Sequence, residues 1–126
     1  MKMSPVRRTV AIVLIAVFSQ MSLADNASAT KIIAGVLVNL NHFPSDDEKV
    51  ALQAVSSDET AGRGFQLIAT AVANIQHTAT TADKDIMTRI IASDRATARA
   101  RELAEIVLGL SHAPSDEAKA ALQAML

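Results

Sequence analysis

The feature that most limits what this chain can fold into is a pattern that recurs every 35 residues. Each of its three histidines, His42, His77 and His112, stands 35 residues from the next. The first and third copies agree most closely, because Pro44-Ser45-Asp46 matches Pro114-Ser115-Asp116. A fixed period of about 20 to 50 residues is typical of proteins built from repeated structural units. The sequence therefore predicts three tandem units within one small protein.

Upstream of each histidine the apolar residues fall at helical spacing. In the second copy they are Phe65, Ile68, Val72 and Ile75, which share one face of a helix. We expect the first helix of each copy to bury this stripe and to end at the histidine. The same columns in the other two copies hold Ile33, Leu37 and Leu40, and Leu103, Val107 and Leu110.

A second helix is expected after each histidine. Ser45, Thr80 and Ser115 are good N-cap residues, and Ser45 with Glu48 matches the capping-box pattern. Apolar residues follow in these helices at positions 52/55, 87/90 and 122/125. Asp58 and Ser93 precede the next first helix, and we expect them to cap it.

The predicted fold class is all-α, with six short helices in three 35-residue helical hairpins. Each hairpin buries its apolar stripe only against its neighbours, so the three must pack together. An open, solenoid-like stack and a closed bundle both satisfy this requirement. The sequence does not choose between them.

The first 24 residues have the features of a secretory signal peptide. Three basic residues precede an apolar run over Val10–Phe18, and Ser22-Leu23-Ala24 fits a small-x-small cleavage site. The run is about half of the roughly 20 residues that cross a bilayer. We therefore expect removal of residues 1–24 and a periplasmic or secreted bacterial protein with no transmembrane segment after cleavage. Residues 25–126 then form a single domain with repeats at approximately 25–57, 58–92 and 93–126.

Composition narrows the range of functions. Residues 25–126 keep nine of the 12 basic residues and all 13 acidic ones, a net charge of −4 that is not typical of nucleic-acid binding. The absence of cysteine excludes thiol catalysis and thiolate metal sites. His42, Ser45 and Asp46 include the residue types of a hydrolase triad, but the group recurs along the chain and Ser45 is expected to cap a helix. We expect a protein that is not an enzyme.

The three histidines are the sharpest candidates for a site. Three converging imidazoles can hold zinc or copper, and one can ligate haem. In an open stack, equivalent positions lie roughly 8 to 10 Å or more apart, too far to share one ion, whereas a closed bundle brings them together. The interpretation favoured by the sequence is that each histidine caps the C-terminal end of a helix. Binding of zinc, copper or haem by His42, His77 and His112 is the alternative.

A cluster of arginines is the other candidate surface. Arg89, Arg95, Arg99 and Arg101 lie where the second copy passes into the third, whereas acidic residues gather at 46–48 and 58–59. Such polarity can steer a partner or an anionic lipid surface, and an ordinary solvated face is the alternative. The expected function is a helical interaction module that binds a protein or peptide partner through these arginines, with contact to a membrane surface as a further use.

Overall fold

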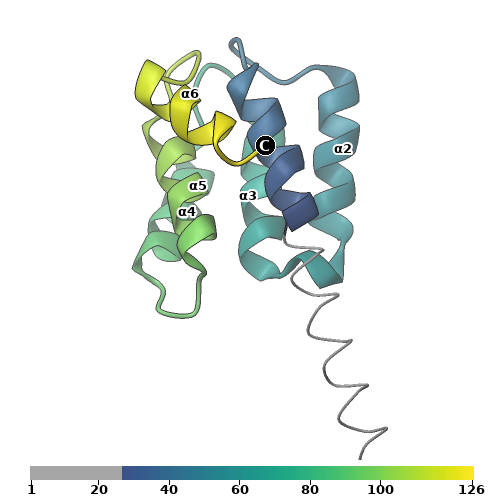
Figure 1. Cartoon of the computed structure of the whole chain (residues 1–126), viewed down its shortest axis with the longest axis vertical. Helices are drawn as coiled ribbons and strands as arrows, with labels where there is room; N and C mark the ends of the chain where they lie inside the picture. The colour runs from purple at the N-terminus through teal and green to yellow at the C-terminus, as the bar shows by residue number, and fades with distance from the viewer. Residues whose placement is uncertain (1–26) are drawn as a thin grey trace, which may run out of the picture.

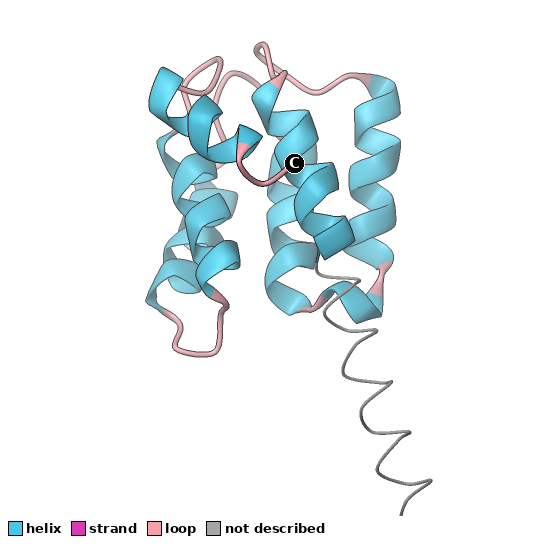
Figure 2. Ribbon diagram, in the orientation of Figure 1, coloured by secondary structure: helices cyan, strands magenta, loops and turns pink. Residues whose placement is uncertain are grey.

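The computed structural model describes residues 27–126, so the predicted signal peptide over residues 1–24 lies outside the described residues. The regular structure of the described part is helical, and the predicted all-α class is confirmed (Figures 1 and 2). A first helix over residues 27–38 is followed by α2 (Asp46–Ser57), the short 3-10 helix η1 (Glu59–Ala61), α3 (Arg63–Ala73), α4 (Thr81–Ala92), α5 (Ala98–Gly109) and α6 (Asp116–Gln123). None of the described helices is both long and apolar enough to cross a membrane.

Side-chain caps determine where α2, α4 and α6 begin, as the sequence predicts. The hydroxyl oxygen of Ser45 accepts a hydrogen bond from the Glu48 N–H over 3.2 Å, and the Glu48 carboxylate accepts one from the Ser45 N–H over 2.8 Å. The predicted capping box of α2 is therefore present. Thr80 and Ser115 cap α4 and α6 through their hydroxyl oxygens, as predicted.

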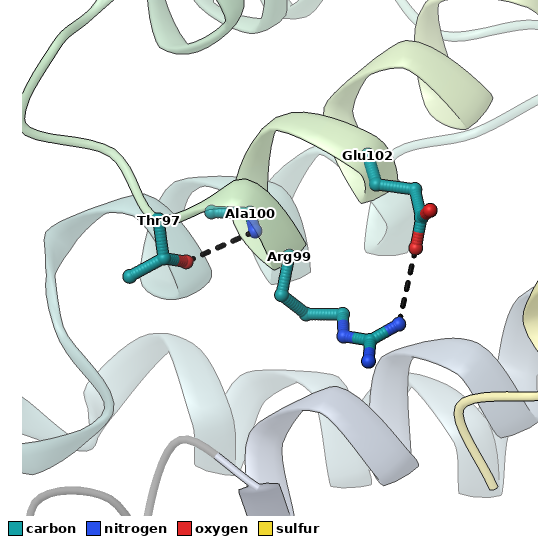
Figure 3. A network of polar contacts seen from close by, with 4 residues as sticks. All are labelled: Thr97, Arg99, Ala100 and Glu102. Carbon is teal, nitrogen blue, oxygen red and sulfur yellow. Dashed lines mark hydrogen bonds and ion pairs between the residues drawn. The ribbon is translucent and has the colours of Figure 1, made fainter.

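Two predicted N-cap residues, Asp58 and Ser93, do not cap the helices for which they were predicted. Asp58 caps η1, whereas α3 begins after Gly62, where no side chain is available to cap it. Ser93 ends α4, and Thr97 caps α5 by accepting a hydrogen bond from the Ala100 N–H over 3.1 Å (Figure 3). Additional turn residues lie between the helices, so α5 starts later than predicted, whereas the late start of α3 is the one that Gly62 and Gly64 predict. Glycine is a poor helix former, which accounts for the late start of α3.

The predicted apolar columns form one core. Every residue in them is buried, and so are Leu52, Val55, Met87, Ile90, Leu122 and Met125 of the second helices. The helix α3 packs against α2, α4 and α5. The C-terminus lies beside the first helix (Figure 1). The Cδ2 atom of Leu126 is 3.9 Å from the position that a Cβ on Gly35 of that helix would occupy. The helices therefore pack as a bundle whose last residue contacts its first helix.

Candidate metal centre

The three histidines lie at the centre of the same tight turn. In each, the N–H of the following residue donates to the carbonyl oxygen of the preceding one, over 2.9 Å at His42, 2.8 Å at His77 and 2.7 Å at His112. The central φ angles are 73°, 69° and 64°. A three-residue turn of this kind with a positive central φ is a rare and strained γ-turn. Among the described residues, these histidines are the only non-glycine positions with a positive φ.

Buried residues hold each turn from both sides. The residue two positions before each histidine is buried, and so is the residue two positions after it. The pairs are Leu40 and Pro44, Ile75 and Ala79, and Leu110 and Pro114. The helices before the turns end three or four residues ahead of the histidine, at residue 38, Ala73 and Gly109, which corrects the predicted helix ends. The residues between each helix end and its histidine bring one apolar side chain, that of Leu40, Ile75 or Leu110, into the core before the turn.

Backbone hydrogen bonds join the three turns into a closed cycle. The N–H of His77 donates to the carbonyl oxygen of His42, that of His112 to His77, and that of His42 to His112, each over 2.6 Å. Hydrogen bonds of this kind each contribute about 0.5 to 1.5 kcal/mol net, which offsets part of the strain in the turns. Segments 35 and 70 residues apart in the chain are thereby held at one point.

The imidazole rings converge beside this backbone cycle. Their centroids are 5.0 Å apart for His42–His77 and His77–His112 and 5.1 Å apart for His42–His112. The Nδ1 atoms of His77 and His112 are 3.1 Å apart, and one ring nitrogen from each histidine lies within 4.8 Å of the others. Three nitrogens around a tetrahedral zinc ion are about 3.3 Å apart, given Zn–N bonds of about 2.0 to 2.1 Å. The ring nitrogens are therefore about 1.5 Å or less from the spacing that one shared ion requires.

The predicted helix-capping role of the histidines is wrong. The ring nitrogens of His77 and His112 bond to each other, and within the described part of the chain no imidazole bonds to a helix carbonyl oxygen. The rings point toward one another because the left-handed turn reverses the chain after the helix has already ended. An imidazole there is too far along the chain to serve as the cap.

The cluster is open to solvent on one side. His42 is half-buried, whereas His77 and His112 are exposed. A cavity of about 360 Å³ beside them is lined by Phe43, Lys49, Gln76 and His77. A metal held by three histidines keeps coordination positions for water or an anion, and the Lys49 ammonium favours an anion there.

The donor set suits particular metals. Three neutral imidazoles match zinc, copper and nickel, whereas calcium and magnesium prefer oxygen ligands. Because the rings converge to about 5 Å, a porphyrin has no room between them, whereas ligation of haem by one exposed histidine stays a prediction. Metal-bound histidines are often oriented by carboxylates. Here the backbone cycle and the buried anchors orient the three turns.

The structure gives the four predicted arginines different roles. Arg101 donates from Nε to the Ser93 carbonyl oxygen over 3.2 Å and from Nη2 to that of Ala96 over 2.9 Å, so it holds the loop between α4 and α5. Arg99 forms an ion pair with Glu102 over 3.1 Å (Figure 3). The other two members, Arg89 and Arg95, line a groove that also includes Arg63. Sequence reasoning did not find Arg63, because it precedes Arg89 by 26 residues and meets it only in the folded chain.

No protein-family model, curated protein or solved structure matches this chain. The function is therefore inferred from the geometry of the site itself.

Proposed function

We propose that this protein binds one divalent transition-metal ion, Zn²⁺ or Cu²⁺, through His42, His77 and His112. The observation that carries the proposal is the convergence of the three rings, with centroids 5.0 to 5.1 Å apart. The sequence alone favoured a module for a protein or peptide partner over a metal-binding protein. One shared ion requires the three imidazoles to lie close together, and in the folded protein they do. We therefore rank metal binding above the binding of a protein or peptide partner.

The backbone conformation supports the same proposal. A non-glycine residue in the left-handed region costs about 1 to 2 kcal/mol, and glycine adopts it without that penalty. Yet this chain has histidine at all three such turns. Strained backbone positions cluster at functional sites, so retention of an imidazole in each strained turn points to a use for the side chain.

The 35-residue period offers a simple origin for the site. Three copies of one sequence pattern supply three imidazoles, one from each copy. A solvent-exposed site with open coordination positions suits reversible loading. We therefore favour a carrier or buffer of metal ions, located outside the cytoplasm if residues 1–24 act as a signal peptide.

Binding of a protein or peptide through Arg89, Arg95, Arg99 and Arg101 stays a prediction. Arg99 and Arg101 already have partners within the chain. Of the four predicted arginines, this leaves Arg89 and Arg95 for the binding of a protein or peptide. Contact with a membrane surface through the same arginines also stays a prediction, as does the absence of catalysis.

Isothermal titration of Zn²⁺ and Cu²⁺ into the untagged protein tests the proposal, and the absence of a tag matters because tag histidines bind the same ions. We expect one ion per chain. Each of His42→Gly, His77→Gly and His112→Gly should weaken binding by more than about 100-fold, since loss of second-sphere partners alone costs about 10- to 100-fold.

Matched control variants are Asn41→Ala and Ser111→Ala, which alter exposed neighbours of two histidines and should bind as the unmodified protein does. Electron paramagnetic resonance of the Cu²⁺ form should show coupling to several nitrogen nuclei. The proposal fails if no saturable site is found, or if the three histidine variants bind like the controls.

A further inference from the structure

A groove lies at the N-terminal end of α3, away from the histidines in the chain. It has a volume of about 640 Å³ and is bounded by the start of α3, the end of α4 and the loop before α5. Pockets for small ligands are typically about 300 to 1,000 Å³. Buried Phe65, Ile90 and Ala100 line it, together with the partly exposed Leu67 and Ile86. Its lining is therefore largely apolar, and aliphatic side chains are the most frequent kind in it.

Three arginines line the same groove: Arg63, Arg89 and Arg95. In the part of the chain that the structure describes, none of their guanidinium groups forms an ion pair or a hydrogen bond, whereas Arg99 and Arg101 do. The residues that line the groove include no carboxylate. The three arginines thus have no acidic partner among the residues that line the groove.

The start of α3 adds to this charge. Gly62 is the N-cap of α3 and supplies no side-chain hydrogen bond, and it lines the groove with Arg63 and Gly64. The uncapped N–H groups of a first helical turn favour an anion. Here they support the arginines, which carry the argument together with the aliphatic lining.

We propose that this groove binds a monomeric aliphatic anion, a straight hydrocarbon chain that ends in a carboxylate. The carboxylate pairs with Arg63, Arg89 and Arg95, and the hydrocarbon lies over Phe65, Ile90 and Ala100. Guanidinium groups match carboxylates geometrically, and each buried methylene strengthens binding by about fourfold. The groove and the three histidines are separate sites, so this ligand does not depend on a bound metal.

The test is titration of dodecanoate, below the concentration at which it forms micelles, into the full protein. Dodecyltrimethylammonium is the control for charge, and butyrate is the control for chain length. We expect saturable binding of dodecanoate at one per chain and binding at least about tenfold weaker for both controls. Comparable binding of the cationic amphiphile would overturn the charge argument, and comparable binding of butyrate would overturn the aliphatic one.

Two variants locate the site. Arg89→Gln with Arg95→Gln removes two exposed charges and should weaken dodecanoate binding at least about tenfold, while Arg99→Gln, outside the groove, should leave it within about twofold. Ala96→Phe fills the groove and should also weaken binding. Zn²⁺ affinity should be unchanged in all three variants, which separates a failure here from a failure of the metal proposal.

Two other ligands of this groove, a membrane surface and an acidic peptide, would give different results. If the protein sediments with phosphatidylglycerol vesicles and ignores monomeric dodecanoate, the surface binds a membrane and the proposal is wrong. It is equally wrong if an acidic peptide binds through Arg89 and Arg95 and dodecanoate does not compete with it.

Discussion

The backbone N–H of His77 donates a hydrogen bond to the carbonyl oxygen of His42 over 2.6 Å, although the two residues stand 35 positions apart. Through this bond and its two counterparts at His112, the main chain brings the three imidazoles together before any ion is bound. The conformational entropy lost in bringing the three histidines together is therefore lost during folding. Preorganisation of this kind raises affinity, since binding need not order the ligand residues.

Glycine and alanine at position 77 should have opposite consequences for stability, although both remove the ligand. The φ angle of His77 is 69°, which suits glycine and strains alanine. We expect metal-free His77→Gly to be more stable than metal-free His77→Ala by about 1 kcal/mol, and neither to bind Zn²⁺ tightly. Urea unfolding of both variants measures the difference, and equal stabilities would argue against a strained turn.

Metal binding should stabilise the folded protein. An ion present at about 100 times its dissociation constant adds about 2.7 kcal/mol, which raises the Tm of a domain of this size by about 10 to 20 °C. Differential scanning calorimetry with and without Zn²⁺ checks this, and an excess of chelator should return the Tm to its metal-free value. A Tm that does not respond to Zn²⁺ in the unmodified protein would contradict a site formed only in the folded state.

The buried anchor next to His77 should matter for both stability and metal affinity. Ile75 is 1% exposed and Ile68 is fully buried, both in the core around α3. Truncation of either to alanine should cost about 2 to 5 kcal/mol. Only Ile75→Ala should also weaken Zn²⁺ binding, by several-fold, because Ile75 fixes the turn that carries His77. Titrations at a temperature where both variants stay folded compare them, and equal affinities would show that the core does not position the turn.

Arg101 should contribute to stability where Arg99 does not. Arg101 donates to the carbonyl oxygens of Ser93, Asp94 and Ala96, whereas the Arg99–Glu102 pair is about half exposed at both ends. Arg101→Met should destabilise the fold by about 1 to 3 kcal/mol, and Arg99→Met by less than about 0.5 kcal/mol. Chemical denaturation gives both values. A similar, small loss for the two variants would mean that Arg101 does not hold the loop between α4 and α5.

Loss of the capping box of α2 should be measurable. Ser45 and Glu48 satisfy each other's backbone N–H groups, so Ser45→Ala should cost about 1 kcal/mol. Ser57→Ala, at the exposed end of the same helix, is the matched control and should change the free energy of unfolding by less than about 0.5 kcal/mol. If the two variants unfold alike, the capping box contributes nothing to the folded state.

Sequence periodicity by itself determined the helical class, the buried columns and the caps of α2, α4 and α6. These features depend on residues within a few positions of one another, so local spacing was sufficient to find them. The same reasoning failed where two local signals competed. It assigned the start of α5 to Ser93 instead of Thr97.

Only the tertiary structure determined how the histidines and the arginines are arranged. Local spacing placed each histidine near a helix end and therefore suggested that it caps that helix. The left-handed turn at each histidine, and its hydrogen bonds to the other two copies, cannot be found from the residues of one copy. Arg63 joins Arg89 and Arg95 in one groove for the same reason, since the distance between them along the chain is unrelated to their distance in the bundle. The sequence repeats a histidine three times, but only the packing of helices far apart in the chain brings the three copies to one point.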